Sequence, residues 1–458
     1  MELHTSVKRA TNMTNNITPL QALYHPEHGG KHRVVVVGAG FGGLAVAAGL
    51  ESVDAEVTLV DQRNHHTFQP LLYQVATAGL DANDISYPTR RIARDKPNLN
   101  AVQGEVIGVD FEGNAVILSD GRRVDFDSLV LALGGITAHF GVPGVAEHAF
   151  GLKSAADAVT LRDRVLRSFD QMATELQQGM AHRPEATTIV IVGGGPTGVE
   201  LAGGFSELTT RVLGLDYPEI DQDAIRIVLV EGQGAVLGGF AERLQNNARQ
   251  TLEGMGVELM LNTQVASVTS TCVELDNGQS VAADTVVWAA GIRAHPLAEQ
   301  IGLETGRGGR VIVNPDLTIP GHDNVYAIGD FAAVEGEEGL LPQVAPAAIQ
   351  AGEYVADQIA GRISRSVSSP APFSYRNKGS MATIGRHAAV VELPNGRTVK
   401  GFMGWVAWLG LHLVMLVGFG NRVTVLVKWA WNYLTYDRGS RALIEAPATP
   451  ELESGSDR

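Results

Sequence analysis

The segment RVVVVGAGFGGLAVAAG, residues 33–49, decides the fold of the first part of the chain. Its unbroken β-branched run predicts a strand covered on both faces, as in a parallel sheet, and the alanine-rich run after the glycines predicts a helix. Gly38 permits a tight turn, Gly40 lets backbone N–H groups approach a pyrophosphate, and Gly43 lets the helix pack closely on the strand. The next apolar run ends at Asp61, where a carboxylate can accept hydrogen bonds from ribose hydroxyls. The segment therefore predicts a βαβ unit that binds a dinucleotide.

A second unit of the same kind begins with TIVIV, residues 188–192. Gly193, Gly195 and Gly198 form its glycine motif, and its second strand, IRIVLVE, ends at Glu231. A carboxylate at this place repels a 2′-phosphate and favours NADH over NADPH, although a merely exposed strand-end acid is the alternative. We call each glycine motif, with the strand before it and the helix after it, a cradle. Two cradles in one chain indicate two dinucleotides and an α/β fold with two Rossmann-like domains.

Turn signals between these segments predict hairpins. Asp120-Gly121 and Asn277-Gly278 each separate two apolar runs. Such dipeptides are typical of two-residue β-turns, so we expect antiparallel strands on both sides of each.

The composition excludes several classes of protein. At 458 residues the chain is long enough for two or three domains. Its single cysteine, Cys272, cannot form an internal disulfide, a CxxC redox pair or a cysteine-ligated metal cluster, so we expect reducing surroundings and no metal. The formal net charge of −15 repels polyanions and argues against nucleic acid as a partner.

The C-terminal segment differs from the rest in charge and composition. Residues 395–441 carry six bases and one acid, a net charge of +5, so the remaining residues together carry −20. Four of the five tryptophans lie there, and residues 401–420 have no formal charge. Aromatic and basic residues around an apolar stretch are typical of a membrane interface. The stretch is long enough to span a membrane but contains five glycines and His412, so a membrane span, a monotopic anchor and a homodimer contact are the three interpretations.

The two cradles together resemble those of the two-dinucleotide-binding-domain flavoproteins. In that group the N-terminal cradle binds FAD and the inserted second cradle binds NAD(P)H. The piece WAAG, which ends at Gly291, and the piece NVYAIGD, which ends with Gly329 and Asp330, support the resemblance. It implies that the Gly-Asp pair returns to the FAD domain, where the aspartate contacts the ribityl chain or the pyrophosphate. Members that reduce disulfides or peroxide, and members that oxidise sulfide, rely on cysteines, so a membrane-soluble electron acceptor remains.

The sequence also resembles a particular family, type II NADH dehydrogenase, the single-chain NADH:quinone oxidoreductase, especially its actinobacterial branch. The resemblance covers about residues 33–441 and rests chiefly on HHTFQPLLYQVATAG, residues 65–79, and KGSMATIGR, residues 378–386. It implies that the stretch from Phe68 to Leu72, which contains Gln69, lies against the flavin. It also implies that Lys378 lies near the pyrimidine side of the flavin, although a solvated surface lysine is the alternative.

Two further roles follow from this resemblance. Glu200, which the sequence places in the first turn of the helix after the second cradle, matches a carboxylate that relays protons for quinone reduction. An acid stabilised only by the helix dipole is the alternative. Gln350 matches the second glutamine of the AQxAxQ quinone motif, whereas Pro346 replaces the first glutamine.

The resemblance also implies a domain plan and a setting. The expected regions are a polar tail (1–32), an FAD-binding domain (33–152 plus 296–370), an NADH-binding domain (153–295), a membrane-anchoring and dimerisation region (371–441) and an acidic tail (442–458). Such an enzyme passes hydride from NADH to FAD and two electrons to a membrane quinone without pumping protons. We expect a homodimer on the lipid bilayer surface at the cytoplasmic face of the membrane. Two alternatives remain open: an NADH reductase with a soluble acceptor, and a flavin-binding interaction protein whose NADH oxidation is incidental.

Overall fold

The structure is a computed structural model that describes residues 30–337, 339–365, 371–435 and 438–443. The polar tail expected at the N-terminus, as far as residue 29, and the acidic tail from residue 444 lie outside the described residues. The chain divides into two compact units. Unit 1 comprises Met1–Thr67, Tyr87–Ile136 and Ile292–Lys378, and unit 2 comprises Phe68–Ser86, Thr137–Gly291 and Gly379–Arg458.

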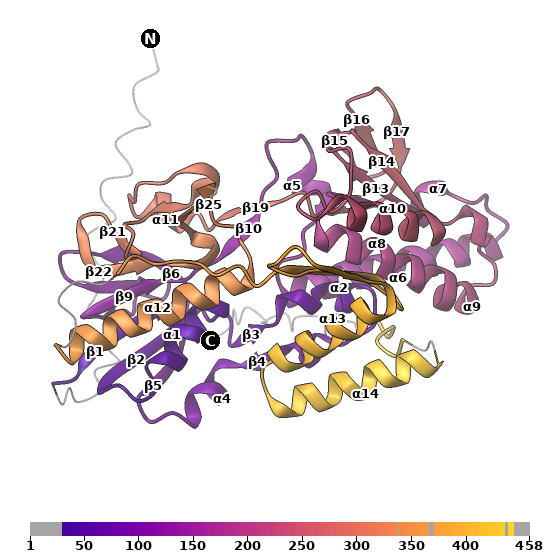
Figure 1. Cartoon of the computed structure of the whole chain (residues 1–458). Helices are drawn as coiled ribbons and strands as arrows, with labels where there is room; N and C mark the ends of the chain where they lie inside the picture. Colours follow the sequence, from indigo (N-terminus) through magenta and orange to yellow (C-terminus); the bar gives the residue numbers. More distant parts are fainter. Residues whose placement is uncertain (1–29, 338, 366–370, 436–437, 444–458) are drawn as a thin grey trace, which may run out of the picture. The chain divides into compact units, whose positions relative to one another are not determined.

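A six-stranded sheet forms the centre of unit 1 (Figure 1). In spatial order its strands are β21 (Thr318–Ile319), β22 (His322–Ala327), β9 (Ser128–Leu131), β1 (His32–Val37), β2 (Ala55–Asp61) and β5 (Leu99–Gln103). All neighbouring strands are parallel except β21 and β22. The predicted buried parallel strand is confirmed, because β1 has a parallel neighbour on each side and its last four valines are at most 3% exposed.

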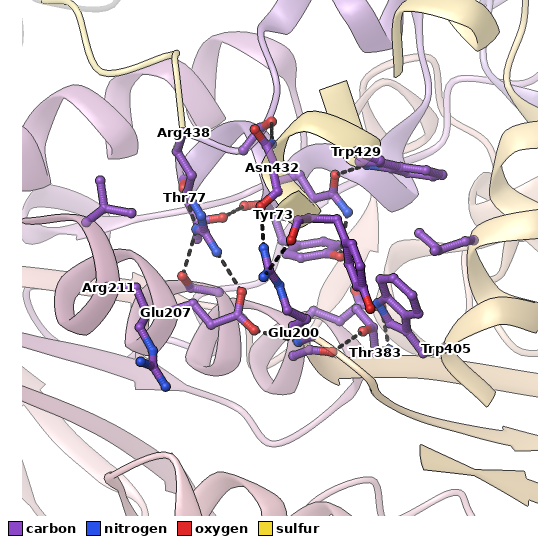
Figure 2. A pocket seen from close by; sticks show the side chains of 18 residues that line it. Tyr73, Thr77, Glu200, Glu207, Arg211, Thr383, Trp405, Trp429, Asn432 and Arg438 are labelled. Atoms are coloured by element: carbon purple, nitrogen blue, oxygen red, sulfur yellow. Dashed lines mark hydrogen bonds and ion pairs between the residues drawn. The ribbon is translucent and has the colours of Figure 1, made fainter. Parts of the chain in front are cut away.

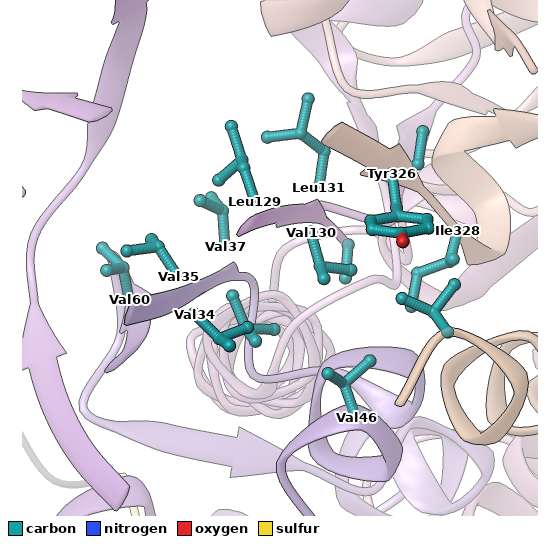
Figure 3. Packing of buried hydrophobic residues seen from close by; sticks show 14 of the residues in the cluster. Val34, Val35, Val37, Val46, Val60, Leu129, Val130, Leu131, Tyr326 and Ile328 are labelled. Carbon is teal, nitrogen blue, oxygen red and sulfur yellow. The ribbon is translucent and has the colours of Figure 1, made fainter. Parts of the chain in front are cut away.

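Apolar side chains pack a helical layer against this sheet. Figure 3 shows Val34 and Val130 on the face of the sheet that is turned toward Val46 of the first helix, α1 (Phe41–Gly49). All three valines are fully buried. Helix α1 packs in turn against α12 (Ala345–Ile363). The glycine motif therefore lies between strand β1 and helix α1, and α1 is held by the sheet and by α12.

Unit 2 repeats the arrangement with a five-stranded sheet. Its strands in spatial order are β11 (Ala149–Phe150), β18 (Thr285–Trp288), β12 (Thr188–Val192), β13 (Arg226–Glu231) and β14 (Val257–Leu261). All neighbouring pairs are parallel, and β12 lies between β13 and β18 as β1 lies between β2 and β9. The principal helices of unit 2 before its C-terminal part are α2 (Leu72–Ala76), α3 (Ala82–Ile85), α6 (Ala155–Gln177), α8 (Pro196–Leu208) and α10 (Glu242–Gly254). The predicted α/β fold with two Rossmann-like parts is confirmed.

Both predicted hairpins are present. The strands are β7 (Ala115–Leu118) and β8 (Arg123–Asp125) in unit 1, and β16 (Cys272–Leu275) and β17 (Ser280–Ala282) in unit 2. Each pair is antiparallel and encloses the glycine-containing turn that the sequence indicates.

The C-terminal part of unit 2 is a three-stranded antiparallel sheet followed by two helices. The elements are β26 (Ser380–Gly385), β27 (Ala388–Glu392), β28 (Thr398–Lys400), α13 (Gly401–Met415) and α14 (Phe419–Thr435). Helix α13 packs on β27, where a Cβ atom at Gly404 would lie 2.8 Å from the carbonyl oxygen of Ala389. The uncharged stretch of residues 401–420 thus forms one continuous helix only as far as Met415. Within the described residues, no helix has the length and apolar character needed to cross a membrane.

Candidate active site

The glycine cradle of unit 1 has the geometry that its sequence predicts. Gly38 adopts a φ of 105°, and a Cβ atom there would lie 2.3 Å from the carbonyl oxygen of Ala132. A Cβ atom at Gly43 would lie 1.9 Å from the carbonyl oxygen of Gly38, whereas one at Gly40 would meet nothing within 4 Å. The first and third glycines are therefore required by the turn and by helix packing, and the second leaves the backbone open to a ligand.

Asp61 is fixed beside this cradle by backbone hydrogen bonds. Its two carboxylate oxygens accept from the N–H groups of Ala39 and Arg63, each at 2.7 Å. Each oxygen keeps a further lone pair, so the carboxylate can still accept from ribose hydroxyls. The carboxylate thus ties the end of β2 to the second residue of the glycine motif.

His66 adds a buried polar atom to the cradle of unit 1. Its Nδ1 donates to the carbonyl oxygen of Ala39 at 2.8 Å, which leaves Nε2 as an acceptor. Nε2 has no hydrogen-bond partner among the described residues, and His66 is only 2% exposed. Burial lowers the pKa of His66 and keeps the ring neutral. An orphaned buried acceptor next to an open glycine cradle fits the hydroxyl-rich ribityl diphosphate of FAD. Sequence reasoning missed His66, although it lies within the quoted HHTFQP motif.

The cradle of unit 2 repeats this geometry. Gly193 has a φ of 110°, and a Cβ atom at Gly198 would lie 1.8 Å from its carbonyl oxygen. A Cβ atom at Gly195 would meet nothing within 4 Å. Glu231 accepts from the N–H groups of Gly194 at 2.5 Å and Gln233 at 2.8 Å, as Asp61 does in unit 1. The two acids therefore occupy equivalent places at the two cradles.

The remaining candidates for the cofactor sites fall in both units. In unit 1, Gly329 and Asp330 begin a 3-10 turn after β22, and the carbonyl oxygen of Asp330 accepts from the Gln343 amide at 2.9 Å. In unit 2, a Cβ atom at Gly291 would lie 2.9 Å from the ring of Phe140. Gln69 is exposed on a 3-10 turn of unit 2, and its amide donates to the carbonyl oxygen of Lys153 at 3.4 Å.

Gln350 and Lys378 belong to unit 1. The Gln350 side chain projects from α12 and forms a two-way pair with the backbone of Arg376, donating to its carbonyl oxygen at 3.0 Å and accepting from its N–H at 2.9 Å. This pair holds the extended segment that leads to Lys378, which is exposed. Pro346 lies in the first turn of α12, where a proline costs no hydrogen bond. The amide of Gln350 thus performs a structural task in addition to any contact with a quinone.

Glu200 does not lie where the sequence places it. Helix α8 begins at Pro196, so Glu200 is its fifth residue and lies beyond the first turn, where no acid is found. The expected first-turn position was wrong because Pro196 and Thr197 already belong to the helix. Stabilisation by the helix dipole, which fades within the first turn, therefore does not explain this acid.

Burial controls the chemistry of Glu200. A Cβ atom at Gly203 would lie 1.6 Å from the carbonyl oxygen of Ile384, so β26 can lie directly on α8 and bring the N–H of Thr383 to 3.3 Å from the Glu200 carboxylate. Desolvation raises the pKa of Glu200 to about 8, although the Thr383 N–H and the Trp408 side chain favour the ionised form. A carboxyl group with such a pKa can hold and release a proton near neutral pH.

A cavity of about 120 Å³ within unit 2 has Glu200 in its wall (Figure 2). Its titratable lining also includes Tyr73 from α2, Glu207 from α8, and Arg211, Arg386 and Arg438. Tyr73 and Glu207 could have been suspected from the sequence, because one lies in the motif 65–79 and the other seven residues after Glu200 on an apolar helix. Nothing in the sequence indicates that Arg438, beyond α14, folds back into this wall.

Comparison with known proteins identifies the class to which the fold belongs. Residues 32–352 match the family model described as pyridine nucleotide-disulphide oxidoreductase, and residues 377–436 match the NDH2 C-terminal domain. The solved structure of NDH2 from Plasmodium falciparum with NADH has a TM-score of 0.80 at 19% identity, over 91% of this chain and 100% of that chain. The sulfide:quinone oxidoreductase of Aquifex aeolicus has a TM-score of 0.67 at 18% identity, over 84% of this chain and 90% of that chain.

The curated relatives narrow this class to one family. The type II NADH:quinone oxidoreductases NdhA and Ndh of Mycobacterium tuberculosis are 41% and 38% identical, each over 91% of this chain and over 90% and 91% of their own lengths. The chain belongs to the type II NADH:quinone oxidoreductase family. It is therefore an FAD-dependent enzyme that oxidises NADH and reduces a quinone, and the two alternative functions left open by the sequence are set aside.

Proposed function

We propose that the cradle of unit 1 holds FAD and that the cradle of unit 2 holds NADH. The repeated glycine geometry, open at Gly40 and Gly195, supports two dinucleotide sites, and the unpartnered buried Nε2 of His66 beside the unit 1 cradle is the observation that favours FAD there. Asp61 and the orphaned Nε2 of His66 would bind FAD, together with Gly329 and Asp330. When bound, FAD supplies the chemistry of accepting a hydride and returning two electrons to a quinone. Glu231 would bind the adenosine ribose of NADH and repel a 2′-phosphate.

Glu200 would supply a proton to the quinone side of the reaction. The overall reaction, NADH + H⁺ + Q → NAD⁺ + QH₂, takes up one proton from solvent for each turnover. Glu200 is suited to hold it because burial gives its carboxyl group a pKa near 8. Lys378 would stabilise negative charge at the flavin, and Gln350 would position the quinone or the segment that carries Lys378.

The proposed assignment is tested by binding as well as by turnover. In purified full-length protein, Asp61→Ala should lose flavin while unit 2 still binds NADH, which calorimetry and the flavin absorbance measure separately. Glu231→Ala should retain flavin and weaken NADH. Loss of both ligands from either single variant would show that the two cradles do not divide the cofactors in this way.

The chain would dock on a lipid bilayer surface through α13 and α14. Helix α14 has one polar face and one apolar face: Lys428 contacts Asp81 at 2.5 Å and Asp84 at 2.6 Å, whereas Leu434 is 77% exposed. The other large apolar side chains that the described residues of these two helices expose are Phe402, Met403, Val406, Leu411, Val414, Met415, Phe419, Val423, Leu426, Val427, Trp431 and Tyr433. An apolar face this large on two adjoining helices is typical of membrane docking.

Two variants test the docking with matched exposure. Leu434→Glu places a charge on the apolar face, and Leu215→Glu does so at an equally exposed leucine (80%) outside these helices. We expect Leu434→Glu to reduce binding to lipid vesicles and quinone reduction while ferricyanide reduction persists, and Leu215→Glu to change neither. Equal effects of the two substitutions would refute the docking face.

The same face would lie on the cytoplasmic side of the membrane, because NADH does not cross lipid bilayers. A homodimer is proposed as the oligomeric state in the membrane. Light scattering of the detergent-solubilised protein gives the protomer number, and a monomer that retains full quinone reductase activity would refute the dimer as the functional form.

A further inference from the structure

The cavity next to Glu200 connects a half-buried, desolvated carboxyl group with the surface of unit 2. Glu200, Gly204, Glu207 and Arg211 follow each other at three- and four-residue intervals, so they share one side of the helix and line the cavity. Glu207 keeps 25% of its side-chain surface, and Arg211 is exposed. The cavity of about 120 Å³ has room for several waters, with which its charged and polar side chains can form hydrogen bonds. Waters in this cavity would connect the surface of unit 2 with Glu200.

The wall of this cavity is held by Arg438. Its guanidinium donates to the Glu207 carboxylate at 2.7 Å, and to the carbonyl oxygens of Thr77 at 2.7 Å and Gly204 at 3.0 Å. Arg386 donates its backbone N–H to the other Glu207 oxygen at 2.5 Å. Figure 2 shows Arg438 and Glu207 directed toward each other across the cavity lining. These hydrogen bonds thus fix the position of the Glu207 carboxylate, which lies on the part of the cavity wall nearer the surface.

Tyr73 is oriented as a hydrogen donor by a chain of side chains. Trp429 donates its indole N–H to Oε1 of Gln74 at 2.7 Å, and Nε2 of Gln74 donates to the Tyr73 hydroxyl oxygen at 2.8 Å. Because the indole can only donate, it fixes the orientation of the amide, and the amide in turn makes the Tyr73 oxygen an acceptor. The hydroxyl proton of Tyr73 is therefore available to a partner other than Gln74.

Tyr73 stays protonated next to the two acids. Burial, and then the charge of Glu200, raise its pKa well above the ordinary value. Among the described residues, the other titratable groups around Glu200 are Glu207, Arg211, Arg386, Tyr433 and Arg438 on the cavity wall, and His412, which stacks on Trp408 with ring centroids 4.0 Å apart. Burial lowers the pKa of His412 to about 4, so His412 is neutral at pH 7 and adds no charge.

We propose that this cavity delivers to Glu200 the proton that quinone reduction takes up from solvent, and that the Tyr73 hydroxyl is the last protein donor on the route. NADH brings two electrons and one proton, and the quinol carries two electrons and two protons, so one proton must enter. When Tyr73 donates its proton toward Glu200, its oxygen takes a replacement from a cavity water, and the phenol is restored. The proposal rests on the proposed role of Glu200 as the proton store.

The direct test measures protonation of Glu200 without turnover. In the oxidised holoenzyme without NADH or quinone, a light-triggered release of protons shifts the infrared carboxyl band of Glu200, which Glu200→Gln identifies by deleting it. We expect Tyr73→Phe to slow the rise of this band on the order of tenfold, because cavity water remains as a slower path. Tyr217→Phe is the matched control, since Tyr217 is a hydrogen-bonded tyrosine of unit 2 that does not line the cavity.

A second variant leaves Tyr73 in place. Trp429→Phe removes the donor that fixes the Gln74 amide, so we expect an intermediate slowing without loss of the tyrosine. In rapid mixing of the holoenzyme, both variants should slow the quinone-dependent step and leave the NADH-dependent step unchanged, because only the first consumes a solvent proton.

Two results separate the route from the role of Glu200. If Glu200→Gln impairs the quinone-dependent step but Tyr73→Phe and Trp429→Phe match the wild type in the infrared measurement, the route is refuted and Glu200 retains its role. If Glu200→Gln leaves the quinone-dependent step unchanged, the proposed role of Glu200 as the proton store is refuted. Slowing in Tyr217→Phe equal to that in Tyr73→Phe would also refute the route.

Discussion

The second and third glycines of the unit 2 cradle, Gly195 and Gly198, predict a clean separation of binding from folding. A Cβ atom at Gly198 would lie 1.8 Å from the carbonyl oxygen of Gly193, and real Cβ contacts are essentially never under 3.0 Å. In Gly198→Ala the helix must therefore move from the strand by roughly 1.2 Å, the difference between these two distances. The buried neighbours Val199, Leu201 and Ala202 move with it. We expect a cost of about 3 kcal/mol, the upper end for overpacking in a core.

Gly195→Ala is the matched substitution three residues earlier. A Cβ atom there meets nothing within 4 Å, and the backbone φ of −70° suits alanine. The loss of a glycine N-cap costs about 1 kcal/mol. The added methyl group occupies the approach of the backbone to the pyrophosphate, so NADH should bind at least about tenfold more weakly.

Calorimetry of the full chain checks both expectations. At about 2–4 °C per kcal/mol for a unit of this size, Gly198→Ala should lower the unfolding midpoint of unit 2 by roughly 6–12 °C, and Gly195→Ala by no more than about 4 °C. Flavin content should be unchanged in Gly195→Ala, because the cradle of unit 1 is separate in sequence and structure. Equal destabilisation by the two alanines, or wild-type NADH affinity in Gly195→Ala, would refute the reasoning.

Three further predictions concern acidic and amide side chains. Glu231→Arg should weaken NADH and admit NADPH, so the ratio of kcat/KM for the two should fall at least about tenfold; an unchanged ratio would remove Glu231 from the specificity site. Gln350→Leu breaks the pair with Arg376 and should raise the KM for quinone without changing the KM for NADH. Steady-state kinetics with both substrates measure the two constants. Glu200 has its pKa raised to about 8 in the folded state, so it contributes stability that is present below its unfolded pKa and lost as the pH rises through about 8. Between about pH 5 and pH 8.5 this loss should amount to roughly 4 kcal/mol in the wild type, and Glu200→Gln should remove it from thermal unfolding curves; an identical pH dependence in both proteins would contradict the desolvated carboxyl.

The polar contacts of α14 explain how one helix can serve two environments. Asn421 donates to the carbonyl oxygens of Asp84 and Ser86 at 3.0 and 3.1 Å, and Asn432 donates to that of Gly79 at 2.9 Å. These contacts satisfy backbone groups of the segment between α2 and β4 (Ser86–Pro88) and fix the rotation of the helix about its axis. The apolar face is consequently held outward, whatever surface it meets.

Local sequence determined much of the fold and of the cofactor cradles. The parallel strands, the two glycine turns and the hairpins depend on residues that are neighbours in the chain, so β-branched runs, glycine spacing and turn dipeptides specify them. The positions of Asp61 and Glu231 follow as well, because each ends the strand next to its own glycine motif. The short reach of these interactions is the reason that the sequence suffices.

Tertiary structure alone decided the environment of Glu200. Its carboxyl group is desolvated by β26 and α13, which are more than 180 residues away, and the cavity beside it is completed by Arg438 from beyond α14. The sequence also could not predict that Gln350 pairs with Arg376, or that His66 has a buried acceptor without a partner. Burial and the orientation of hydrogen bonds are properties of the atoms that surround a group, and long-range packing brings those atoms together only in the folded chain.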